Sequence, residues 1–129
     1  MRVFFSTGEA SGELLAADLL GAMAGVHQFV RIGRYAFVGG YAKLPKDLPP
    51  FMLADGNPPA VLGPNLVGLR RHGFARESIA ELKDAYKTIY ASGNNVSRAV
   101  AALRETIQTA EGRTLLEFLE APSERGILK

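Results

Sequence analysis

The residues of this sequence best suited to holding a polar ligand stand close together, at Asn65, Arg70 and Arg71. A guanidinium group offers planar N–H donors that match phosphate and carboxylate groups, and an Asn side chain offers both a donor and an acceptor. The two histidines, His27 and His72, are the side chains best placed to titrate near neutral pH. Asn65, Arg70 and Arg71 could form a site for an anionic ligand, or the two arginines could be charges on a solvated loop.

Composition argues against several other kinds of chemistry. The chain has no cysteine, and its histidines and scattered acids lack metal-ligand spacing, so we expect no metal site and no cofactor. The formal net charge of +2 is too small to indicate nucleic-acid binding. No apolar run approaches the roughly 20 residues that span a bilayer. Acids at positions 9, 13 and 18 interrupt the apolar start, which argues against a signal peptide, so we expect a cytoplasmic protein.

Residues 1–25 are predicted to form a strand, a turn and a helix. Val3, Phe4 and Phe5 make a short apolar run, and residues 6–8 end it. A helix is then expected from Glu9 or Ser11. Its apolar face would carry Leu14, Leu15, Leu19 and Met23.

From residue 26 the apolar residues recur with a period of six. Val26, Ile32, Val38 and Leu44 follow this spacing, and glycine comes directly after Ile32 and Val38. Such a period is typical of a left-handed parallel β-helix, with one aliphatic side chain per hexad pointing inward. Residues 26–56 are therefore predicted to form a short β-helix, although an ordinary strand could carry the same pattern by chance.

The rest of the chain is predicted to be a loop followed by helices. Proline and glycine recur over residues 57–75, where we expect an extended connection rather than a helix. Residues 76–129 carry apolar side chains at helical spacing and are predicted to form a helical domain. Its first helix covers about residues 76–92, its second begins near Val96, and a short third lies between Gly112 and Pro122. The fold class is thus mixed: strand-turn-helix, β-helix remnant and α-helical unit.

A set of short motifs adds a family resemblance. In chain order they are His27-Gln28-Phe29, Val38-Gly39-Gly40, Pro49-Pro50, Gly56-Asn57-Pro58, the run from Asn65 to Arg71, Gly73-Phe74 and Arg125-Gly126-Ile127. In this order they resemble the C-terminal part of the bacterial UDP-N-acetylglucosamine O-acyltransferases that use acyl carrier protein. The resemblance implies a left-handed β-helix followed by a helical domain, a homotrimer, and transfer of a 3-hydroxyacyl group in lipid A biosynthesis.

The resemblance also implies roles for single residues around a cleft between subunits. His27 and Gln28 match positions that line the cleft for the sugar and the acyl group. Gly40 matches the position that limits acyl-chain length, where a missing side chain leaves room for a longer chain.

The resemblance also implies roles for the residues from Asn65 to His72. Asn65 matches a residue that meets the uridine of UDP-N-acetylglucosamine, and Arg71 matches one near phosphate. Arg70 and Arg71 together belong to a basic site for acyl carrier protein, which is acidic. His72 stands where the family often has another arginine.

One functional residue of the family has no match here. Its catalytic base is a histidine on an earlier coil, upstream of the position that His27 matches, and His72 does not supply it either. We therefore expect no catalytic residue and little independent enzyme activity. The alternatives are a non-catalytic module for oligomerisation or acyl-carrier-protein binding, or a sequence with no evolved function.

The first 25 residues carry a second resemblance. The run from Phe4 to Glu13 resembles the start of lipid A disaccharide synthase, a glycosyltransferase of the same pathway, in which the last acid is usually Asp. A glycosyltransferase needs two Rossmann-like halves, which one strand and one helix cannot supply. The chain is thus interpreted as the head of one enzyme joined to the tail of another. Its head is expected to fold over the open end of the coil.

Overall fold

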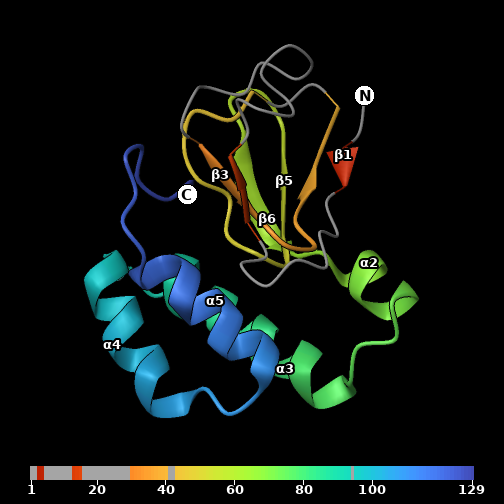
Figure 1. The fold of residues 1–129 in the computed structure, drawn as a ribbon, viewed down its shortest axis with the longest axis vertical. Coiled ribbons are helices and arrows are strands. Elements are labelled where there is room, and N and C mark those ends of the chain that lie inside the picture. Colours follow the sequence, from red (N-terminus) through yellow and green to blue (C-terminus); the bar gives the residue numbers. More distant parts are fainter. Residues whose placement is uncertain (1–2, 5–12, 16–29, 41–42, 94) are drawn as a thin grey trace.

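The computed structural model describes residues 3–4, 13–15, 30–40, 43–93 and 95–129, in a layer of strands beside a helix bundle (Figure 1). One sheet has the order β1 (Val3–Phe4), β4 (Phe37–Val38), β5 (Met52–Asp55) and β6 (Ala60–Pro64). A second pair joins β2 (Glu13–Leu15) to β3 (Arg31–Gly33).

Two parallel pairings bring residues 31–38 beside residues 48–54, and we call this segment, residues 31–54, the coil. Val38 of β4 pairs with Ala54 of β5, and Ile32 of β3 forms a parallel bridge with Leu48. In both pairs the two residues are the same number of positions apart in the sequence, slightly less than three hexads. Ile32, Val38 and Leu44, the hexad positions in the described residues, are all buried.

A close backbone approach fixes one corner of this coil. A Cβ at Gly33 would overlap the backbone of Pro50. The Gly33 amide donates to the carbonyl of Leu48, and the Phe51 amide donates to that of Arg34. Glycine is needed here because the two segments of the coil touch without room for a side chain.

Two expectations about local structure are wrong. Glu13–Leu15 is a strand antiparallel to β3, where a helix was expected, because a partner strand is available to pair with it. β1 also runs antiparallel to β4, so the backbone of both N-terminal strands lies against the coil. Residues 57–75 are more than a connecting loop, since β6 forms an antiparallel hairpin with β5 and α2 (Leu66–Arg71) follows it.

The helical unit agrees with the expected helices over most of its length. It contains α3 (Arg76–Tyr86) with a π-turn extension, η1 (Lys87–Ala91), then α4 (Val96–Thr106) and α5 (Ala110–Glu120). Helix α5 packs on α3 and α4, and α3 contacts β6. Gly112 lies inside the last helix and does not interrupt it. A side chain at this position would overlap the Glu81 carboxylate.

Glu81 connects α3 to the start of α5. Its carboxylate accepts hydrogen bonds from the backbone N–H groups of Gln108 and Thr109 and from the Thr109 hydroxyl. Burial raises the pKa of Glu81, but these hydrogen bonds outweigh it and leave the pKa below its ordinary value. The ionised form therefore holds this link at neutral pH.

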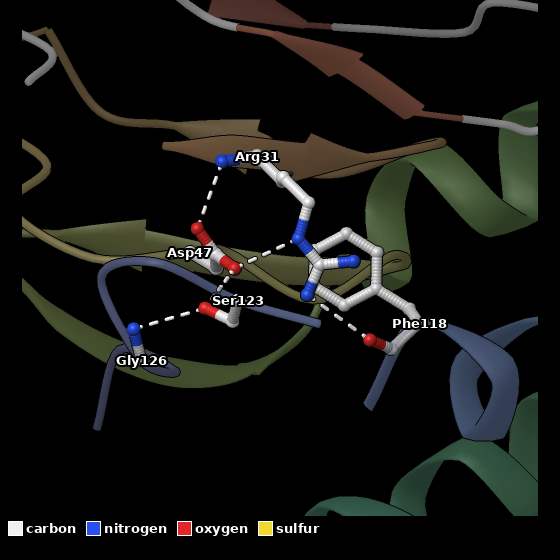
Figure 2. A network of polar contacts seen from close by, with 5 residues as sticks. All are labelled: Arg31, Asp47, Phe118, Ser123 and Gly126. Carbon is white, nitrogen blue, oxygen red and sulfur yellow. Dashed lines mark hydrogen bonds and ion pairs between the residues drawn. The ribbon is translucent and has the colours of Figure 1, made fainter. Parts of the chain in front are cut away.

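A buried ion pair fastens the coil to the C-terminal tail (Figure 2). Arg31 donates to Asp47 through its backbone N–H and its Nε, each at 2.9 Å, and its guanidinium lies 4.0 Å from the centre of the Phe118 ring. The Ser123 hydroxyl donates to Asp47 at 2.6 Å and accepts from the Gly126 N–H. Asp47 is fully buried. Its carboxylate connects Arg31 to the tail, and the Arg31 guanidinium in turn contacts Phe118 of α5.

Candidate functional site

Helix α2 carries Arg70 and Arg71 at the junction of the strand layer and the bundle (Figure 1). The helix is short, and its only buried residue is Leu69. Both arginines lie in its last turn and are exposed, where positive charge interacts favourably with the C-terminal end of the helix. The chain then reverses through Gly73, which has a φ of 72°.

Asn65 begins this helix and is buried, with 5% of its surface exposed. Its side-chain oxygen accepts from the Gly68 N–H at 3.2 Å, and its amide nitrogen donates to the Tyr35 carbonyl at 3.2 Å. This bond uses one of the two amide hydrogens. Asn65 is therefore a structural cap of α2 in addition to any contact with a ligand.

Arg70 also borders an open hollow of about 370 Å³ between α2 and α3. Its lining combines three cationic side chains with an apolar floor, and the residues are Arg70, Phe74, Arg76, Ile79, Ala80 and Lys83. Arg71 is exposed on the same helix but is not among these lining residues. Such a hollow is suited to a partner with an acidic and partly apolar surface.

The remaining expected site residues fall elsewhere. Gly40 follows β4 and is half-buried, on a different element from α2. Its neighbour Gly39 donates to the Ala54 carbonyl at 2.8 Å, and a Cβ at Gly39 would overlap the Asp55 carboxylate. His27 and Gln28 lie outside the described residues. Within the described residues, no group of acids and histidines could hold a metal ion.

Arg76 and Ile79 were not predicted as part of a site, and both line the hollow together with Lys83. The signal for them is present, because residues spaced by three, four and seven along a helix share one face. The hollow brings Lys83 of α3 together with Arg70 of α2.

The fold and the site define a class of protein in which a small strand layer with parallel and antiparallel pairings precedes a C-terminal helix bundle, with a basic hollow between α2 and α3. Residues 47–128 match the family profile described as UDP-N-acetylglucosamine O-acyltransferase, domain 2. The chain therefore belongs to the UDP-N-acetylglucosamine O-acyltransferase family.

Individual relatives agree with this membership. The acyl-(acyl carrier protein)–UDP-N-acetylglucosamine O-acyltransferases of Burkholderia lata and Thiobacillus denitrificans are each 40% identical to the chain. These alignments cover 98% of this chain but 51% and 50% of the relatives. The chain thus spans about half the length of the curated relatives that it matches.

Solved structures give the same result. LpxA from Acinetobacter baumannii superposes with a TM-score of 0.78 at 37% identity, over 82% of this chain and 42% of that one. The UDP-N-acetylglucosamine acyltransferase of Bacteroides fragilis gives 0.77 at 38% identity, over 81% and 41%. Among the described residues of our chain, no helix has the length and apolar character to cross a membrane.

Proposed function

We propose that this protein takes part in lipid A biosynthesis, in the transfer of a 3-hydroxyacyl group from acyl carrier protein to UDP-N-acetylglucosamine in the cytoplasm. Family membership and the names of the relatives support this reaction. We assign to these 129 residues the docking of acyl carrier protein and part of the nucleotide-sugar site. We do not assign them the general base, because neither His27 nor His72 matches its position in the family.

The basic hollow is the observation that carries the docking proposal. Arg70, Arg76 and Lys83 line the hollow together with the apolar side chains of Phe74 and Ile79. Acyl carrier protein is acidic, so complementary charge would speed the encounter and orient the complex. The apolar floor would add contact area that leaves water on binding.

The substrate contacts are proposed from the family pattern. Arg71 would pair with phosphate, and the second amide hydrogen of Asn65 would reach the uridine. Gly40 would leave space for the acyl chain, and His27 and Gln28 would line the cleft. We propose no cofactor and no metal.

The architecture of the functional form is also a proposal. The parallel pairings of β3 to Leu48 and of β4 to β5 support a remnant of a left-handed β-helix over residues 26–56. We propose that three copies assemble around it, so that each cleft lies between neighbours. We propose that residues 1–25 derive from the start of a lipid A disaccharide synthase and cover the coil; the pairing of β1 and β2 with it supports the covering.

Removing both arginines of α2 is expected to weaken docking. The Arg70→Ala/Arg71→Ala variant should bind acyl carrier protein about tenfold more weakly, or about 1.4 kcal/mol, as measured by titration calorimetry at low ionic strength. Lys87→Ala/Arg98→Ala is the matched control, since it removes the same charge from exposed positions of the bundle outside the hollow. Equal losses in the two variants would indicate non-specific attraction and would refute this docking site.

The alternative function is a non-catalytic oligomerisation or carrier-protein-binding module. Leu62 and Val67 favour it, because both are large apolar side chains and are 58% and 62% exposed. They lie on two successive elements, β6 and α2, which in this alternative another chain would cover.

A further inference from the structure

A single residue of the coil, Tyr35, contacts both ends of helix α2. At the N-terminal end, the Tyr35 carbonyl accepts the hydrogen bond from the Asn65 side chain. At the C-terminal end, the Tyr35 ring meets the edge of His72, with ring centres 5.0 Å apart, and that of Phe74 at 4.9 Å. His72 is the C-terminal cap of α2, and Phe74 follows the turn at Gly73.

The backbone of Tyr35 is held in an uncommon conformation. Its φ is 58°, in the left-handed region that residues other than glycine rarely occupy. Such a conformation persists only where the surroundings fix it. Here the Phe51 ring stacks beside the Tyr35 ring at 6.1 Å with an angle of 9° between the planes, and Phe51 in turn contacts Phe74.

Helix α2 depends on such external contacts. A helix of six residues is too short to be stable by its own hydrogen bonds. Its buried anchor is Leu69, and its two ends are held by Asn65 and by the aromatic group of Tyr35, Phe51, His72 and Phe74. Phe74 also lines the hollow beside Arg70, so the same contacts reach the basic site.

We propose that Tyr35 is a positioning residue for the basic site: by holding both ends of α2, it sets where Arg70 and Arg71 stand. The inference rests on the proposed function, in which these arginines receive the acidic partner. It assigns Tyr35 no contact with a substrate. The effect of Tyr35 on binding passes through the arginines.

The test is a double-mutant cycle with fluorescently labelled acyl carrier protein, measured by anisotropy well below the unfolding temperature of each variant. Tyr35→Phe keeps the ring contacts and the carbonyl and should bind within about twofold of the parent protein. Tyr35→Leu removes the aromatic contacts and should bind about fivefold more weakly. Asn65→Ser keeps a capping oxygen but removes the amide that reaches Tyr35, and it should weaken binding similarly.

The cycle separates positioning from direct contact. In an Arg70→Ala/Arg71→Ala background, the losses from Tyr35→Leu and Asn65→Ser should disappear, because the residues through which they act are gone. Losses of the same size in both backgrounds would overturn the proposal, as would parent-like binding by Tyr35→Leu and Asn65→Ser.

A second measurement needs no partner. Hydrogen exchange at the amides of Leu69 and His72, which donate within α2 to Asn65 and Gly68, should quicken about tenfold in Tyr35→Leu and Asn65→Ser but not in Tyr35→Phe. If the parent protein fails to bind acyl carrier protein, the proposed function falls. The exchange rates still decide whether Tyr35 holds α2, and unchanged rates would overturn that.

Discussion

Acyl transfer by these 129 residues is expected to be at least about 100-fold slower than by a full-length relative, because general acid–base catalysis typically contributes about 100- to 10,000-fold. Our proposal assigns the family's base to neither His27 nor His72. His72 lies at the end of α2 with its ring against that of Tyr35. Loss of cleft positioning would slow the reaction further.

The measurement is a radiolabelled assay with acyl carrier protein and UDP-N-acetylglucosamine. The full-length Burkholderia lata relative is the matched comparison, at the same concentrations of both substrates. Turnover near that of the relative would show that another residue of this chain serves as the base.

Loss of the Asp47 carboxylate is expected to give the largest change in stability. Asp47→Ala would leave the Arg31 guanidinium, 8% exposed as a residue, without its carboxylate partner. Removing one partner of a buried ion pair costs about 3–5 kcal/mol. The tail would loosen with it, because the Asp47 carboxylate also accepts the hydrogen bond from the Ser123 hydroxyl.

Equilibrium urea unfolding measures this effect. Ser123→Ala is the matched control, since it keeps the ion pair and removes only the two hydrogen bonds of the hydroxyl, to Asp47 and from Gly126; it should cost about 2 kcal/mol. If Asp47→Ala does not fold, Asp47→Asn keeps the shape and removes the charge. A free energy of unfolding within about 1 kcal/mol of the parent for Asp47→Asn would mean that the ion pair does not hold the tail.

The parts of the fold that could be predicted from the sequence are those with a strong local period. Leu82, Ala85 and Ile89 have helical spacing and are all buried in α3 and η1. Ile32 and Val38 have the hexad spacing and are buried in the coil. In both cases the spacing of the apolar residues indicates which face is buried.

The elements that were missed depend on partners distant in the sequence. α2 lies among prolines and glycines, and it forms because Asn65 caps it and Tyr35, far away in sequence, holds both ends. Glu13–Leu15 has an apolar pair that suits a helix or a strand, and β3 decides between them by pairing. No local pattern joins Arg31 to Asp47.

The candidate site was also predicted only in part. Arg70, Arg71 and Asn65 were predicted from residue type and from the family motif, and the structure places all three on or beside α2. Arg76 and Lys83 join Arg70 only through the packing of α2 and α3 around Phe74. From the sequence, the capping role of Asn65 could not be told apart from its implied contact with uridine.

The central claim is that the chain carries the docking end of an acyltransferase. Titration of the isotope-labelled protein with acyl carrier protein, followed by amide resonances, tests it most directly. The account predicts saturable shifts confined to α2 and the first turns of α3, centred on Arg70 and Arg71. A spectrum that stays unchanged there at saturating carrier protein would contradict it.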